Sequence, residues 1–439
     1  MHVNQREIPE SFLHFVWRGR YLHPGRRLIA TCGKTVEVLH PGYWNHDQGP
    51  DFLQARLRID GILWQGHVEI HVQSGDWYAH RHHTDKGYNG VVLHVAMNPG
   101  SKAVIRQDGT AIPEIAVAQH IPEDLYSAYH RLMLHEASLA CEGQWNRVSD
   151  LVKKSWFTRL SMERMERASV RLNHKLLNTA GDWNQAIWEA LAAYLAGPVN
   201  KEAFIQIAEQ IPARLLNAYK SNFIQQEALL MGAAGLLQTK TPLQDPYYQR
   251  LRSEWQHLSH KHSLSGIPVF PLKFHRMRPA SFPTIRLSQL AAISRHWPVL
   301  TSLLVQEGIT EFLQIPIFAS QYWNEHYVFG SKKPSCSKTL GRNQKEALII
   351  NTFAPLGLLY QRAHGSPDAS SWLDNVLSNL APENNRHTRL FMKMGFSPSN
   401  AIYSQGMIEC YTQYCLERRC LDCAIGACLL GKKITTLKK

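Results

Sequence analysis

The chain has 439 residues, and 48 Lys and Arg against 35 Asp and Glu give a formal charge of +13 at pH 7. This length exceeds one ordinary domain and predicts two or three. The positive charge suits a nucleic-acid partner, because phosphates attract Lys and Arg and release counterions on binding. The first residues contain no apolar signal-peptide core, and no run approaches the roughly 20 apolar residues of a spanning helix. We therefore expect a cytoplasmic protein without a membrane partner.

The N-terminal part predicts a helix followed by strands. Pro9 suits a first helical position, and Phe12, Phe15 and Val16 recur at helical spacing, which predicts a helix over residues 9–21 with Glu10 on its other side. Asp108-Gly109 lies between two apolar runs and predicts a hairpin. Alternating apolar residues predict strands over residues 35–40, 52–59, 64–73 and 91–97.

The segment from Asp51 to Gln73 carries the most specific signal. In residues 67–73 polar side chains alternate with Val68, Ile70 and Val72, so the period of a strand puts the polar ones on one face. Mg²⁺ and Mn²⁺ need only one or two carboxylates from a protein, and the metal then polarises a phosphoryl oxygen and activates water. A neighbouring group orients or deprotonates that water. The alternative interpretation is an ordinary half-exposed sheet whose polar face meets solvent.

Pro50-Asp51 followed by Glu69-Ile70-His71 resembles the two half-motifs of the PD-(D/E)XK nuclease superfamily. The resemblance implies a restriction-endonuclease-like core of a helix, a three-stranded hairpin run, a helix and a further strand. It implies Asp51 and Glu69 as ligands of Mg²⁺ or Mn²⁺, and His71 as the group that positions or deprotonates water, assisted by Glu10 or Gln73. The sequence departs from the motif because His71 stands where Lys is usual, and an imidazole is no fixed cation.

Over nearly its full length the chain resembles an uncharacterised bacterial family, domain of unknown function 2851. The resemblance supports the domain boundaries and names no activity. The runs that carry it are residues 10–17, 45–52 and 66–80, Arg278-Pro279 with Phe282-Pro283, and the Cys-rich end.

A loop rich in His and aromatic residues follows the Glu69 strand, over residues 76–83. We interpret it as a nucleic-acid contact in which Trp77 and Tyr78 stack on bases and Arg81 meets phosphate. A packed loop of hydrogen-bonded His is the alternative. Three His also suit Zn²⁺, which would make the protein a different kind of hydrolase. His94, inside an apolar run, is interpreted as a core residue.

From about residue 121 the pattern changes to long helical periodicity. A stretch with several Pro, residues 263–284, interrupts it and carries Arg276 and Arg278, which we interpret as phosphate contacts or as an ordinary solvated loop. The apolar residues recur at three- and four-residue spacing over residues 151–172, 183–195, 213–237 and 287–305.

Five of the eight cysteines lie within nineteen residues near the C-terminus: Cys410, Cys415, Cys420, Cys423 and Cys428. In a reducing compartment such clustering favours a metal over disulfides. The pattern is loosely similar to the iron–sulfur segments that follow some DNA-repair nucleases, and Zn²⁺ remains an alternative. Free buried thiols are the purely structural interpretation.

These observations predict an α+β protein with a nuclease-like part over residues 1–120, a mostly helical part over 121–400 and a Cys-rich segment over 401–439. The expected function is divalent-metal-dependent hydrolysis of phosphodiester bonds in DNA or RNA. The alternative is a non-catalytic nucleic-acid-binding or scaffold protein that retains the fold. The choice between DNA and RNA and the oligomeric state stay open.

Overall fold

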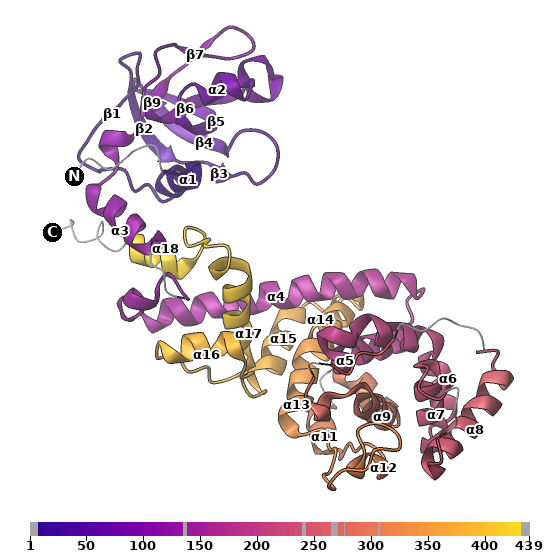
Figure 1. The fold of residues 1–439 in the computed structure, drawn as a ribbon. Helices are drawn as coiled ribbons and strands as arrows, with labels where there is room; N and C mark the ends of the chain where they lie inside the picture. The colour runs from indigo at the N-terminus through magenta and orange to yellow at the C-terminus, as the bar shows by residue number, and fades with distance from the viewer. Residues whose placement is uncertain are drawn as a thin grey trace. The chain divides into compact units, whose positions relative to one another are not determined.

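The structure, a computed structural model, describes residues 8–134, 138–238, 243–264, 271–275, 277–305 and 308–431. The chain divides into two compact units, one of Met1–Trp156 with Cys410–Lys439 and one of Phe157–Glu409. A strand-rich sheet lies in the first unit, and helices make up most of the remainder (Figure 1). The predicted mixture of an N-terminal sheet and a helical remainder is confirmed. The Cys-rich segment groups with the N-terminal unit.

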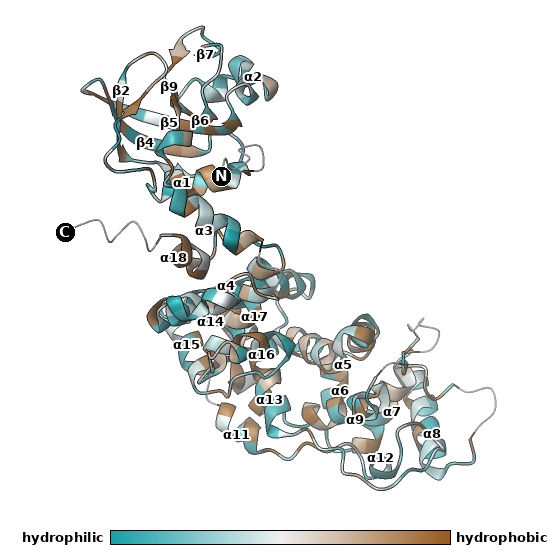
Figure 2. Ribbon diagram, turned by 60° about the vertical axis from the view of Figure 1, so that its left-hand side comes forward, coloured by the Kyte–Doolittle hydropathy of each residue, from teal (hydrophilic) through white to brown (hydrophobic). Residues whose placement is uncertain are grey.

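The sheet of the first unit combines antiparallel and parallel pairs. The strand order is β1-β2-β4-β5-β6-β9, with β3 added beside β4; β1 to β5 pair antiparallel, whereas β5–β6 and β6–β9 are parallel. The central strand β6 is almost continuously apolar and buried (Figure 2). The strands are β1 (Leu28–Ile29), β2 (Thr35–His40), β3 (Tyr43–Trp44), β4 (Phe52–Ile59), β5 (Ile62–Gln73), β6 (Val91–Asn98) and β9 (Glu114–Ala116).

The β4–β5 hairpin fixes which side chains meet. Its two-residue loop is Asp60-Gly61, both with positive φ (47° and 81°), which matches the right-handed twist of the flanking strands. The register runs from Ile59↔Ile62 to Ala55↔Gly66 and then shifts, so that Phe52 pairs with Val68. Gln54, with φ 56°, lies in this bulge. The predicted bounds of β4 agree with the structure, and β5 begins two residues earlier than predicted.

Short helices accompany the sheet (Figure 1). Helix α1 (Glu10–Arg18) begins after Pro9 and buries Phe12, Phe15 and Val16, as predicted, but ends three residues early. Between β5 and β6 lie α2 (Asp76–Ala79) and the 3₁₀ turns η2 (His82–Thr84) and η3 (Lys86–Tyr88). The predicted hairpin around Asp108-Gly109 forms as β7 (Val104–Ile105) and β8 (Ala111–Ile112). The unit also contains η4 (Ala118–His120), α3 (Glu123–Met133), η5 (Glu142–Arg147), the π-helix η9 (Tyr411–Cys415) and α18 (Ala424–Gly431).

The second unit is helical within its described residues, as the periodicity predicts. Helix α5 is kinked at Gly197 (φ 66°), directly before Pro198, where the regular hydrogen bonding is interrupted. The hydrophobic core of the second unit includes Trp188, Phe204 and Trp323. Helix α4 (Asp150–Asn178) begins in the first unit and is followed by α5 (Trp183–Gln210), α6 (Ala213–Ala218), α7 (Phe223–Ala233), α8 (Pro246–Lys261), η6 (Pro279–Ser281), α9 (Pro283–Ser294), α10 (Trp297–Ser302), η7 (Leu303–Val305), α11 (Ile309–Gln314), α12 (Tyr322–Glu325), α13 (Arg342–Leu348), the π-helix η8 (Ile349–Phe353), α14 (Ala354–Ala363), α15 (Ala369–Ser378), α16 (Arg386–Lys393) and α17 (Ala401–Cys410). Among the described residues, no helix combines the length and apolar character that a membrane crossing requires.

Candidate functional site

Two acidic side chains meet where β4 begins. The backbone N–H of Asp51 donates to Oε2 of Glu69 over 3.0 Å, and the N–H of Ile70 donates to Oδ2 of Asp51 over 2.9 Å. Asp51 directly precedes β4 and Glu69 lies within β5, so the pairing of these two strands brings them together. The structure thus places both predicted metal ligands side by side.

Helix α1 adds two side chains to this group. His14 Nε2 lies 3.3 Å from Asp51 Oδ2 and 3.8 Å from Glu10 Oε1. One potential ligand atom from each of Glu10, His14 and Asp51 lies within 4.8 Å of the other two. We call these three residues together with Glu69 the carboxylate group. The sequence places Glu10 and His14 on the same side of this helix by their i, i+4 spacing, but only Glu10 was predicted as a site residue.

Burial and neighbouring carboxylates raise the pKa of Glu69 and of Glu10. Burial raises the pKa of Glu69 to about 9; the charges of Asp51 and Glu10 add to this effect, and the hydrogen bond from Asp51 N–H partly opposes it. The pKa of Glu10 is raised as well, first by burial and then by Asp51, against the effect of His14. Carboxylates held this close resist ionising together unless a positive charge lies among them.

His71 is buried in a relay of hydrogen bonds. Its Nδ1 lies 2.9 Å from His94 Nε2, and His94 Nδ1 lies 2.8 Å from Glu114 Oε2. Burial and then the neighbouring His94 lower the pKa of His71 to about 2. So low a pKa leaves His71 neutral at pH 7, and its predicted role in positioning or deprotonating water stays a prediction. The prediction that His94 is a satisfied core residue is confirmed.

The end of the relay is itself well anchored. Glu114 accepts hydrogen bonds from His94, from Ser74 Oγ (2.5 Å) and from the N–H of Gly100 (3.1 Å). Burial raises the pKa of Glu114, but these hydrogen bonds outweigh it and hold the pKa below its ordinary value. Glu114 is therefore an ionised acceptor at neutral pH.

The His-rich loop approaches the same carboxylate. His82 Nε2 lies 3.3 Å from Glu69 Oε1, and His71 Nε2 lies 3.6 Å from that same oxygen. Burial, followed by the neighbouring His80, lowers the pKa of His82 to about 4. Gln73, predicted to assist, is exposed, and its backbone N–H donates to Asp76 Oδ2. The loop thus contributes His side chains to the site, and the assisting role of Gln73 stays a prediction.

The predicted nucleic-acid contacts of this loop are only partly accessible. Trp77 has no exposed surface and its Nε1–H donates to the carbonyl of Ile105 over 2.9 Å, so its ring cannot stack on a base, and that interpretation is corrected. Tyr78 is half-buried and its hydroxyl donates to the carbonyl of Ala103. Arg81 is exposed and has a left-handed backbone, φ 63°. Of the three residues, Arg81 alone presents a polar group freely to solvent.

The two predicted phosphate contacts of the second unit have different outcomes. Arg278 is exposed and precedes the short helix η6. Arg276 lies outside the described residues.

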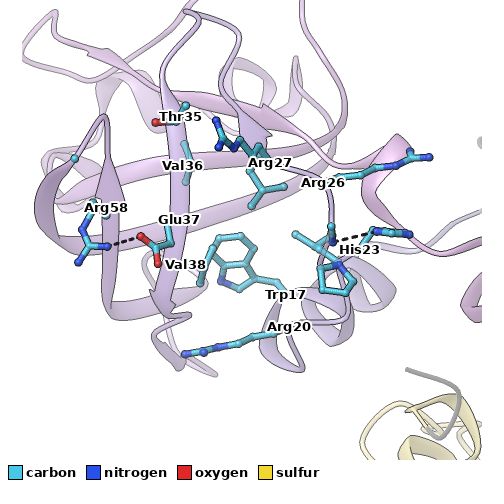
Figure 3. Close-up of a pocket in the computed structure, with 15 residues that line it drawn as sticks. Trp17, Arg20, His23, Arg26, Arg27, Thr35, Val36, Glu37, Val38 and Arg58 are labelled. Atoms are coloured by element: carbon cyan, nitrogen blue, oxygen red, sulfur yellow. Dashed lines mark hydrogen bonds and ion pairs between the residues drawn. The ribbon is translucent and has the colours of Figure 1, made fainter. Parts of the chain in front are cut away.

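A basic cavity of about 680 Å³ lies in the first unit (Figure 3). Glu37 is the acidic residue of its lining, and it forms an ion pair with Arg58 at 2.5 Å. The arginines in the lining are Arg20, Arg26, Arg27 and Arg58. The excess of positive charge makes this cavity a candidate site for phosphate groups, and sequence reasoning did not find it.

All eight cysteines are free thiols. Cys410 Sγ lies 3.9 Å from Cys415 Sγ. Cys141, more than 260 residues earlier in the chain, joins the C-terminal thiols: its pKa is raised first by burial and then by the charges of the neighbouring Cys415, Cys423 and Cys420. Sequence reasoning missed Cys141 because sequence separation hides this proximity.

The other C-terminal cysteines are placed differently from one another. Cys423 is buried and precedes α18, whose first backbone N–H groups, those of Ile425 and Gly426, hydrogen-bond to it. Cys428 lies on α18 and interacts with Tyr21, whose pKa burial raises first and Cys428 further. Cys428 therefore lies near Tyr21, which follows α1, whereas Cys423 lies near Cys141 and the other thiols.

The fold and the site define a mixed α+β protein with an acidic and imidazole-rich group in its N-terminal sheet. The chain belongs to the family described as protein of unknown function, DUF2851, whose model matches residues 10–386. The predicted family is therefore confirmed. No curated protein and no solved structure matches the chain.

Proposed function

We propose that the protein is a divalent-metal-dependent nuclease whose N-terminal unit has a PD-(D/E)XK-type, restriction-endonuclease-like core. The observation that carries the proposal is the meeting of Asp51 and Glu69 through hydrogen bonds of 3.0 and 2.9 Å. The order of elements supports it: helix α1, the antiparallel strands β2, β4 and β5, the short helix α2, and then β6 parallel to β5. This order is the one that the resemblance to the superfamily implies.

Asp51 and Glu69 would hold Mg²⁺ or Mn²⁺, with Glu10 and His14 beside them. When bound, such an ion supplies Lewis-acid polarisation of a phosphoryl oxygen and a lowered pKa of water. The chain's own contribution is to keep carboxylate oxygens close together in a half-buried space. Glu10 is the member of the group that is open to solvent, with its side chain 41% exposed. Its position beside Asp51 and its access to solvent make Glu10 the member of the group best placed to accept a proton from water.

A polyanionic substrate is supported by charge. The chain carries a net charge of +13, and four arginines line the cavity of Figure 3. One of them, Arg58, lies near the end of β4 opposite to Asp51. At about 3.3 Å per residue, strand β4 separates these ends by roughly 20 Å. A nucleic-acid strand that spans several nucleotides would meet both, which assigns binding to the arginines and cleavage to the acids.

The test uses the purified full chain with labelled single- and double-stranded DNA and RNA and with Mn²⁺ or Mg²⁺. We expect cleavage that depends on the metal and is abolished in Glu69→Gln and in Asp51→Asn. Glu123→Gln is the matched control, since it removes the same charge at an exposed position of α3 and should retain activity. Cleavage that persists equally in all three variants would contradict the proposal.

Binding without cleavage by the wild-type protein would favour the alternative, a non-catalytic nucleic-acid-binding or scaffold protein that retains this fold. The substitution of His71 for the usual Lys is the feature that motivates it.

A further inference from the structure

Three imidazoles lie together, and two of them, those of His71 and His82, approach the second carboxylate oxygen of Glu69, Oε1. His71 lies on β5, His80 follows α2, and His82 begins η2. One ring nitrogen of each lies within 4.8 Å of the other two. The Nε2 atoms of His82 and His71 lie 3.3 and 3.6 Å from Glu69 Oε1. We call these three His with Glu69 the imidazole pocket.

The relay behind His71 fixes which of its nitrogens faces the pocket. Glu114 is an acceptor, so His94 Nδ1 carries a proton and donates it over 2.8 Å. His71 Nδ1 lies 2.9 Å from the other nitrogen of His94, Nε2. When His71 Nδ1–H is the donor of this bond, Nε2 of His71 keeps its lone pair and faces Glu69 Oε1, 3.6 Å away. A carboxylate that orients a ligating His from behind is the usual support of a metal site.

The pocket brings together three atoms that can each offer a lone pair to a metal ion. They are Oε1 of Glu69 and the Nε2 atoms of His71 and His82. His82 is 91% buried, and its Nε2 has no hydrogen-bond partner among the described residues. Burying lone pairs against one another is costly, and a cation placed among them satisfies all of them at once. The arrangement calls for a positive ion.

We propose that His71, His80, His82 and Glu69 bind a divalent transition-metal ion, at a position separate from the Mg²⁺ or Mn²⁺ ion of the carboxylate group. Imidazole nitrogen is a ligand for zinc, iron, cobalt and nickel, whereas Mg²⁺ requires oxygen. Glu69 belongs to both groups, since Oε2 accepts the Asp51 N–H and Oε1 faces the imidazoles. A carboxylate shared by two ions is the arrangement of two-metal phosphodiester hydrolysis. In that sense the inference adds to the proposed function.

The test measures Co²⁺ binding to the metal-free full chain by the visible absorption of the ion, without any nucleic acid. We expect the wild type to bind Co²⁺ at the imidazole pocket, with an affinity for this site at least tenfold lower in His80→Ala and in His82→Ala. His80 is exposed, so its removal leaves the core intact. His83→Ala is the matched control, because His83 is in the same loop but packs against Tyr78, outside the pocket. Its Co²⁺ affinity should equal that of the wild type.

Equal Co²⁺ affinity in His80→Ala, His82→Ala and the wild type would overturn the proposal, as would a wild-type chain that gives no absorption. In the second case a proton on Glu69, rather than a metal ion, would serve the facing nitrogen atoms of the pocket as a hydrogen-bond donor. Either failure is distinct from failure of the proposed nuclease, because cleavage with Mg²⁺ is measured separately and requires Asp51, which lies outside the imidazole pocket.

Discussion

The relay from Glu114 to His71 gives the sharpest prediction, because Glu114 touches no ligand atom of the imidazole pocket. In Glu114→Gln the side chain keeps its size but has one carbonyl oxygen and one NH₂ group. If the NH₂ group faces His94, Nδ1 of His94 must become the acceptor and Nε2 of His94 must carry the proton. His71 Nδ1 then accepts, and the proton of His71 moves to Nε2, which points into the pocket and blocks a cation.

The expected magnitude follows from this chain of hydrogen bonds. Loss of a group that orients a metal ligand typically costs 10–100-fold in metal affinity, or about 1.4–2.7 kcal/mol. We expect Co²⁺ to bind Glu114→Gln that much more weakly than the wild type in the absorption titration. The opposite orientation of the amide is disfavoured, because it would set the NH₂ group against the N–H of Gly100, which donates to Glu114 over 3.1 Å in the wild type.

The control separates the proton relay from general damage to the fold. Ser74→Ala removes one donor to Glu114 Oε2 but leaves the bond from His94 in place. Both variants should lower the free energy of unfolding by about 1.5–3 kcal/mol, the range for a hydrogen bond to a charged group. Only Glu114→Gln should weaken Co²⁺ binding. Equal losses of affinity in the two variants would refute the reasoning.

Four further outcomes are expected. The pKa of Glu69 is about 9 in the folded metal-free chain and 4.5 in the unfolded chain, so between these pH values the folded chain binds more protons. The free energy of unfolding should therefore fall as pH rises from 5 to 9. Urea unfolding in EDTA should show this fall in the wild type and a smaller fall in Glu69→Gln. Trp77→Ala should lower the free energy of unfolding by about 3–5 kcal/mol, because it empties a fully buried site; a change below 1 kcal/mol would contradict the assigned burial. Arg27→Ala should weaken nucleic-acid binding at every sequence and reduce the slope of log affinity against log salt by about 1, and an unchanged slope would exclude a phosphate contact. If the C-terminal thiols hold a metal, Cys141→Ser should lower iron or zinc content measured by plasma mass spectrometry, whereas Cys336→Ser, at an exposed thiol, should not; a wild-type chain without either metal would end that prediction.

Local signals predicted the part of the site that lies on regular strands. Alternation of apolar residues identifies β4 and β5, and the order Pro50-Asp51 then Glu69 points to the two acids that the structure brings together. Strand period and hairpin pairing act over short sequence distances, so these features are visible in the chain itself.

The remaining contributions depend on packing between distant segments. The approach of His82 to Glu69 requires the left-handed turn at Arg81, for which an Arg gives no signal. Cys141 joins thiols of the C-terminal segment, which neither spacing nor composition reveals. Trp77, read as a surface aromatic from its polar neighbours, is a core residue because the β7–β8 hairpin covers it.

The bulge at Gln54 has a consequence for how such a site is gained or lost. If the hairpin register that starts at Ile59↔Ile62 continued without interruption, Phe52 would oppose Glu69 and Asp51 would fall one place further along. The bulge therefore takes up the one extra residue that would otherwise put the acids out of register. Deleting Gln54 itself would close the bulge and leave Asp51 opposite Glu69, whereas a residue gained or lost elsewhere between the acids would displace them by one place. Relatives that keep both acids but differ in length between them therefore need not share the chemistry.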